Sequence, residues 1–237
     1  MRYPGGGPLG RKRCRPTVDR RQGAAYRRPY TSRSKPSWAD PFEKNEASPE
    51  AFLCSMLAER GYPTAKLSSL GAGYMRAPTA KQLTDYASNL SGLIRSGDLA
   101  GLQKAVQSGR KMDACNKFGE SVVHLACRKG DPELLRFLLQ NGGSLMCSDD
   151  LGRLPLHDVL WASRPRFELL LLHLNKRPEL LLTADNRGCT PLRYIKRQNW
   201  DAWKGFLATV KDTYWPRLPV AAPTATAVAA AAKGCSS

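Results

Sequence analysis

The feature that most constrains this chain is a stretch of about 33 residues that recurs along its middle. Three segments, 116–126, 149–159 and 185–195, align around a central glycine. Gly119 and Gly152 are 33 residues apart, and Gly152 and Gly188 are 36 apart. A second pair of glycines, Gly97 and Gly130, has the same spacing of 33. A period of this length indicates a solenoid in which each repeat contacts only its neighbours.

The local chemistry of each repeat predicts two short helices. Thr190 is expected to cap a helix with its hydroxyl, and Pro191 suits a first turn where no amide hydrogen is needed. Residues 132–141 predict a second helix with one apolar stripe, which ends at Gly142. The stripe is formed by Leu134, Leu135, Leu138 and Leu139. A single unit cannot bury such a stripe, so neighbouring units must stack.

This pattern resembles the ankyrin repeat, whose signature is a D-x-x-G turn followed by T-P-L-H-x-A, a short helix, a glycine and a second helix ending in leucines. The resemblance covers roughly residues 83–215 and implies an all-α ankyrin-repeat solenoid flanked by disordered tails. We place the domain at 81–216, with units of about 83–115, 116–148, 149–184 and 185–215. The third unit is three residues longer than the second, and we expect the extra residues within 167–183.

The flanking segments differ from the repeats in composition. Residues 1–47 predict a disordered basic tail, because few aliphatic side chains are available to offset the entropy of ordering. Residues 48–60 predict a short helix that begins at Ser48-Pro49-Glu50 and has one apolar face, which would dock on something or serve as a partner's ligand. Residues 61–80, rich in glycine, serine and proline, are interpreted as a linker, and residues 217–237 as a disordered tail rich in alanine, threonine and proline.

Much of the positive charge of the chain lies in the first segment. The whole chain carries a formal net charge of +17, and residues 1–37 hold nine arginines and two lysines against Asp19 alone. A cluster formed by Arg11, Lys12, Arg13 and Arg15 is compatible with nuclear import or nucleic-acid contact. A solvated tail without a specific role and an organelle transit peptide are the other interpretations. We expect a cytoplasmic or nuclear protein, with organelle targeting as the weaker alternative.

Residue patterns of enzymes and metal sites do not occur. The sequence contains no P-loop, nucleophile elbow or HExxH pair. Its seven cysteines include no CxxC pair, and Cys115 and Cys147 are interpreted as packing thiols in consecutive units. No run of about 18 apolar residues predicts a membrane span. We therefore expect no catalytic residues, no metal, no cofactor and no small-molecule substrate.

The histidines have a structural interpretation through the resemblance. His124 and His157 fall at the histidine of T-P-L-H-like motifs. The resemblance implies that each imidazole bonds to the backbone of the neighbouring turn and ties two repeats together. His173 lies in a leucine-rich stretch and is expected at a solvated edge or half-buried with its hydrogen bonds satisfied.

The resemblance also indicates where a partner would bind. The variable positions after each turn and at the end of each inner helix are implied to face a concave groove. These positions are Arg95, Lys117, Phe118, Glu120, Arg128, Lys129, Asp150, Leu151, Arg153, Trp161, Asn186, Arg187, Cys189 and Arg197. Arginine and large aromatic side chains are frequent at binding hot spots. The hypothesis is a non-catalytic adaptor or scaffold that binds an acidic or phosphorylated segment of another protein, anchored on Trp161. The alternative is a nucleic-acid-associated regulatory protein that uses the arginine-rich tail.

Overall fold

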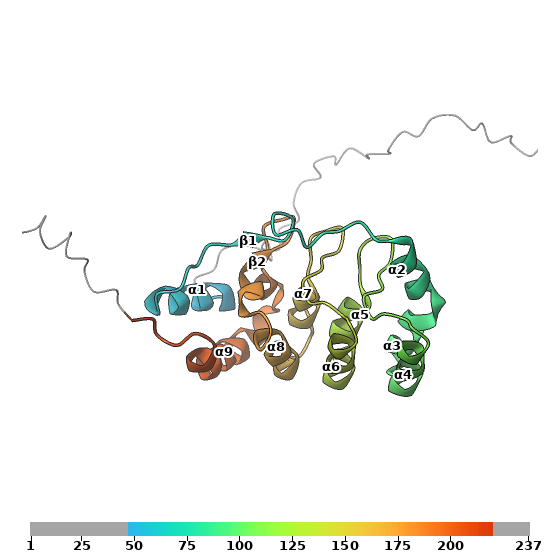
Figure 1. Ribbon diagram of the computed structural model, residues 1–237. Coiled ribbons are helices and arrows are strands. Elements are labelled where there is room, and N and C mark those ends of the chain that lie inside the picture. The colour runs from blue at the N-terminus through green and yellow to red at the C-terminus, as the bar shows by residue number, and fades with distance from the viewer. Residues whose placement is uncertain (1–46, 220–237) are drawn as a thin grey trace, which may run out of the picture. The chain divides into compact units, whose positions relative to one another are not determined.

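A computed structural model describes residues 47–219, and these residues form a row of stacked helix pairs (Figure 1). The second unit is the most regular, with inner helix α5 (Val122–Lys129) and outer helix α6 (Pro132–Gln140). The third pairs α7 (Pro155–Leu160) with α8 (Phe167–Leu174). The all-α repeat architecture expected from the sequence is confirmed.

The first and fourth units are less regular. The inner part of the first unit consists of α2 (Ala80–Asp85), a kinked π-type turn η1 (Tyr86–Leu90) and α3 (Ser91–Ser96), and its outer helix is α4 (Leu99–Gln107). The fourth unit has only two 3-10 turns, η3 (Pro191–Tyr194) and η4 (Arg197–Asn199), before the long helix α9 (Trp200–Tyr214). The extra residues of the third unit form a further 3-10 turn, η2 (Pro178–Leu182), and strand β2 (Thr183–Ala184).

Stacking buries three of the four leucines of the predicted stripe, and Leu139 stays half-buried. Leu134, Leu135 and Leu138 of α6 have no exposed surface, and Ala126 of α5 is also fully buried. Helix α5 packs between α3 and α7, so each inner helix contacts the next along the row. The core is therefore continuous from one unit to the next.

The turns that precede the inner helices are joined into a ladder. Gly119 and Gly152 have φ values of 77° and 76°, in the left-handed region that favours glycine. The Asp150 amide donates to the Phe118 carbonyl at 2.8 Å, and the Asn186 amide donates to the Leu151 carbonyl at 3.0 Å. These bonds align the turn tips along one side of the stack.

One local expectation for the fourth unit is wrong. The Thr190 hydroxyl makes no capping bond, and it donates instead to Glu50 Oε1 at 2.7 Å. The element that follows is a 3-10 turn, and the hydroxyl that would accept an amide in a cap donates to a charged carboxylate, which is a strong acceptor. The hydroxyl therefore ties the repeat to another part of the chain.

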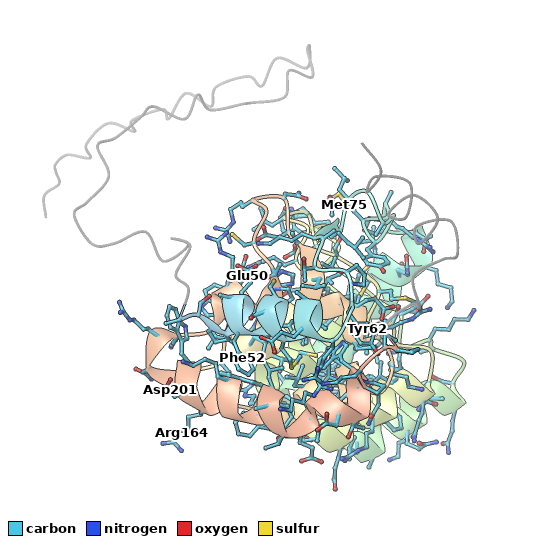
Figure 2. All side chains as sticks on the ribbon, turned by 90° about the vertical axis from the view of Figure 1, so that its left-hand side faces the viewer. Glu50, Phe52, Tyr62, Met75, Arg164 and Asp201 are labelled. Atoms are coloured by element: carbon cyan, nitrogen blue, oxygen red, sulfur yellow. The ribbon has the colours of Figure 1, made fainter. Side chains whose placement is uncertain are left out.

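That other part is helix α1 (Pro49–Glu59), which lies where the sequence predicts a short helix and packs on α9 and η3 at the far end of the stack (Figures 1 and 2). Its Leu53 is fully buried and Leu57 is 3% exposed. At its end, Arg60 donates to the Trp215 carbonyl at 2.7 Å and pairs with Asp212 at 2.6 Å. The sequence left the docking place of this helix open, and the structure puts it on the last unit.

Residues 61–79, called the strap below, form an ordered segment that returns from α1 to the first unit along the turn tips (Figure 1). Strand β1 (Leu67–Ser68) pairs in parallel with β2, and the Ser148 amide donates to the Tyr74 carbonyl at 3.1 Å. The interpretation of residues 61–80 as a linker needs this correction. An extended segment of small residues can offer its backbone to the turns, and composition alone does not reveal this.

Both predicted tails lie almost wholly outside the described residues, which begin at Ala47 and end at Pro219. The cluster of Arg11, Lys12, Arg13 and Arg15 is therefore outside them too. Within residues 47–219, no helix is both long enough and apolar enough to cross a membrane.

Candidate functional site

Six of the residues assigned to the groove line one cleft of about 340 Å³. They come from the turn tips and inner-helix ends of the second and third units. The six are Phe118, Glu120, Arg128, Asp150, Arg153 and Trp161, and Asn116 and Asp149 complete the lining. The period of the sequence thus places side chains that are tens of residues apart around one space. This cleft is called the groove below.

Three large apolar side chains are exposed at or beside the groove. Phe118 is 52% exposed, Leu151 49% and Trp161 51%. The Trp161 ring is held edge-on against the Tyr194 ring, with centroids 5.8 Å apart. Lys117 Nζ lies 5.0 Å from the centroid of the Phe118 ring. Apolar groups gathered at one exposed place mark an interaction surface more often than isolated ones do.

The arginines of the groove are already paired within the chain. Arg128 Nη2 lies 2.6 Å from Glu120 Oε1 and 3.2 Å from Asp158 Oδ2. Arg153 Nη2 lies 2.6 Å from Asp149 Oδ2. Burial raises the pKa of Asp158, and the nearby Arg128 guanidinium acts against that rise. The groove is therefore a balanced set of ion pairs with apolar groups around it, and less basic than the cation count predicts.

Other assigned residues are not part of the groove lining and make contacts of their own. Lys129 Nζ donates to the Arg95 carbonyl at 2.8 Å, and Arg197 stands 5.6 Å from the centroid of the Trp200 ring. The Asn186 side chain donates to the Asp150 carbonyl at 3.2 Å.

Two positions of the fourth unit differ in exposure. Arg187 is exposed and bonds the Tyr194 hydroxyl at 2.5 Å and Asp185 at 3.5 Å. Cys189 is only 2% exposed. Its assignment to the groove is wrong, because the residue is held inside the turn, where its amide donates to Asp185 Oδ1 at 2.9 Å.

His124 and His157 tie neighbouring repeats together, as the resemblance implies. Nδ1 of His124 accepts the Ser121 amide at 3.1 Å, so Nε2 carries the proton and donates to the Arg153 carbonyl at 3.0 Å. His157 repeats this arrangement, with its Nε2 3.2 Å from the Cys189 carbonyl. Burial lowers the pKa of His157 to about 4. Both imidazoles are thus used in structural bonds.

His173 is buried more deeply than the sequence predicts, with no exposed surface. Its Nδ1 lies 2.8 Å from the Leu169 carbonyl, and its Nε2 lies 3.9 Å from Cys127 Sγ. Burial lowers its pKa to about 4. The side chain is neutral and its hydrogen bonds are satisfied within the core.

Sequence reasoning missed the carboxylates that neutralise the groove. Asp149 precedes Arg153 by four residues, and Asp158 follows Arg128 by 30, close to one repeat. The repeat register, applied to acidic residues as it was to basic ones, could have found both. Within residues 47–219, no group of three or more histidine, cysteine, aspartate or glutamate side chains could hold a metal ion.

Comparisons with known proteins agree with the repeat architecture. Residues 90–179 match a family model described as ankyrin repeats (3 copies). Two Arabidopsis thaliana proteins show local similarity. One, named ADP-ribosylation factor GTPase-activating protein AGD2, is 40% identical over 62 residues, which are 26% of this chain and 8% of the relative. The other, ADP-ribosylation factor GTPase-activating protein AGD4, is 33% identical over 89 residues, which are 33% of this chain and 12% of the relative. The matched segments thus span about a tenth of these curated relatives.

Proposed function

Because this chain is an ankyrin-repeat protein, we propose that it is a non-catalytic adaptor or scaffold that holds a segment of another protein in its groove. The observation that carries this proposal is the exposure of Phe118, Leu151 and Trp161 around a single lined space. Side chains of this kind, gathered at the centre of a contact and surrounded by polar groups, provide most of the affinity in protein interfaces.

We further propose an acidic or phosphorylated segment as the ligand, on the ground of assigned cations that are left without an ion pair. Four of the assigned cations lie outside the groove lining and have no carboxylate within ion-pair distance among residues 47–219: Arg95, Lys117, Lys129 and Arg197. Arg128 and Arg153 are already paired, so a negative group gains less from them. We therefore assign the anchoring of apolar residues to Trp161 and Phe118, and the recognition of negative charge to the four outer cations.

The names of the two plant relatives describe GTPase-activating proteins. The similar segment is a small share of each of those chains, so their activity gives no ground for assigning the same reaction here. Ankyrin repeats are typical of protein binding, and we propose a binding role alone.

Peptide selection from a random library on the full-length chain tests the proposal. Trp161→Ala should weaken the selected peptides by about 30-fold, because truncating a hot-spot residue costs about 2 kcal/mol or more. Leu70→Ala is the matched control, since Leu70 is 59% exposed on the strap and lies outside the groove lining. Equal loss in both variants, or no selected peptide at all, would remove the groove as the binding site.

A second pair of variants tests the charge. Lys117→Glu with Lys129→Glu should remove any preference for acidic or phosphorylated peptides and slow their association at low salt. If the preference survives, Lys117 and Lys129 do not recognise the negative charge. If the unmodified chain shows no preference for acidic peptides, the acidic ligand is wrong while the adaptor role stands.

The nucleic-acid alternative rests on the charge of residues 1–37. RNA or DNA binding that weakens with salt and is lost on deleting residues 1–40 would favour it.

A further inference from the structure

A second cavity, of about 410 Å³, lies between the strap and the turns of the second and third units. Tyr74 and Arg76 line it from the strap, and Cys115 and Cys147 line it from the turns. None of its lining residues belongs to the groove. The cavity is therefore a separate space, and two thiols are among the groups that line it.

A buried hydroxyl in the wall of this cavity lacks a partner. Ser148 is 3% exposed, and its Oγ has no hydrogen-bond partner among the described residues. The Ser148 amide is fixed by the Tyr74 carbonyl of the strap, at 3.1 Å. Ser148 thus contributes to the wall of the cavity through its fixed backbone, while its hydroxyl oxygen is buried away from the open space.

Cys147 is the thiol best placed to react in this cavity. It is half-buried, and its Sγ lies 3.2 Å from the Ser144 carbonyl and 3.4 Å from Ser121 Oγ. Ser121 Oγ in turn lies 2.9 Å from His124 Nδ1. The thiol is thus held by two hydrogen-bonding neighbours in a residue that keeps part of its surface exposed. Cys115 is 7% exposed, and burial raises the pKa of its thiol, so it is the poorer nucleophile of the two.

We propose that this cavity is a thiol-modification site, in which Cys147 forms a mixed disulfide with a small amino-acid disulfide of the glutathione type. The Cys147 thiolate attacks one sulfur of the small disulfide, a new S–S bond forms, and the original S–S bond breaks. The departing thiolate takes up the proton that Cys147 lost, so no other oxidant is needed.

Two charges at the cavity select the amino-acid type of disulfide. The Arg76 guanidinium has no carboxylate partner among residues 47–219, and Nε donates only weakly to the Gly73 carbonyl, at 3.5 Å. The Asp113 carboxylate also lines the cavity and accepts from the Gln82 side chain at 3.5 Å. A ligand with a carboxylate and an ammonium group matches this pair of charges, whereas a neutral disulfide matches neither.

The test is native-state reaction with glutathione disulfide, followed by peptide mass spectrometry. Cys14 and Cys235 lie outside the described residues, so the full-length chain carries Cys14→Ser and Cys235→Ser. Cys54 is the internal control, because it is also half-buried but does not line this cavity. Cys147 should be modified at least tenfold faster than Cys54, and Cys147→Ser should abolish the adduct.

A second comparison tests the charge selection. Arg76→Gln should slow the reaction with glutathione disulfide several-fold and leave the reaction with the neutral disulfide of mercaptoethanol unchanged. A later Cys115–Cys147 disulfide would also support the site, because Cys115 would then have displaced glutathione from Cys147. Modification of Cys54 first, or of Cys147 only after denaturation, would overturn the proposal.

Discussion

The two ends of the helical stack are closed in different ways. The first unit begins with a local capping box where the strap enters it: the Thr79 hydroxyl accepts the Gln82 amide at 3.3 Å, and the Gln82 side chain accepts the Thr79 amide at 3.0 Å. The fourth unit has 3-10 turns in place of an inner α-helix and is covered by α1. The bond between Glu50 and Thr190 joins residues 140 positions apart.

The difference teaches that a repeat can lose its inner helix if another part of the chain replaces the buried surface. Terminal repeats of a solenoid need a cover, because each has a neighbour on one side only. A local cap requires little loop closure, whereas α1 must be carried the whole length of the stack by the strap. The C-terminal end should therefore depend on residues that the first unit does not use.

Truncating a buried side chain of α1 should have the largest effect, because it weakens the closure of the C-terminal end alone. Leu53→Ala removes a fully buried side chain from α1 and should lower the free energy of unfolding by about 3 kcal/mol. Leu102→Ala in α4, also fully buried, is the matched variant at the other end. Native-state hydrogen exchange should show that Leu53→Ala exposes the amides of α9 first. Equal exchange of α4 and α9 in both variants would contradict independent closure of the two ends.

Disturbing the contact between the strap and the turns should have the second largest effect on stability. Gly152 and Gly188 have φ values of 76° and 75°, so alanine is strained by about 1 to 2 kcal/mol at either. A Cβ at Gly152 would also lie 2.7 Å from Ser69 Oγ of the strap and 2.4 Å from Asn186 Oδ1, whereas at Gly188 it would meet nothing within 4 Å. Gly152→Ala should therefore cost about 1 to 3 kcal/mol more than Gly188→Ala in denaturant titrations. Similar losses of unfolding free energy in the two variants would show that the strap shifts away from the new Cβ at little cost.

Low pH should lower the free energy of unfolding through His173, which is buried in the interior of the stack. This effect should not depend on how the two ends are closed. The pKa of His173 is lowered to about 4, so the unfolded state binds more protons than the folded state between pH 6.5 and 4. Stability from this group is complete above pH 6.5 and falls as the pH drops, by about 2 kcal/mol at pH 5. His173→Gln should remove this part of the pH dependence from chemical unfolding measured at several pH values. Leu53→Ala should keep it, and a changed slope in that variant would tie His173 to α1.

The sequence predicts the interior of this fold better than its ends. The spacing of Gly119 and Gly152 and the leucines of α6 depend on local conformation and on burial between like units, and both are visible as a period. His124 and His157 follow from the same register. In contrast, the apolar face of α1 predicts that the helix packs against something, but it does not indicate which element. The strap has no repeating pattern of apolar residues, so its pairing with the turns cannot be predicted from the sequence. The groove was predicted as basic because cations were counted without Asp149, which lies four residues before Arg153, and Asp158, which lies about one repeat after Arg128.

The smallest expected effect is the coupling between Glu50 and Thr190. Glu50 Oε1 accepts from the Thr190 hydroxyl at 2.7 Å and from Lys66 at 2.6 Å, and the Glu50 side chain is 14% exposed. In a double-mutant cycle, Glu50→Gln and Thr190→Val should show a coupling energy of about 1 kcal/mol. Thr79→Val with Gln82→Ala forms the matching cycle at the first unit, where the bonds are local. Both cycles are then repeated in the Leu53→Ala background. If α1 closes the fourth unit through this contact, the Glu50–Thr190 coupling energy should vanish there, because α1 must be docked for the two groups to meet. The Thr79–Gln82 coupling energy should stay unchanged.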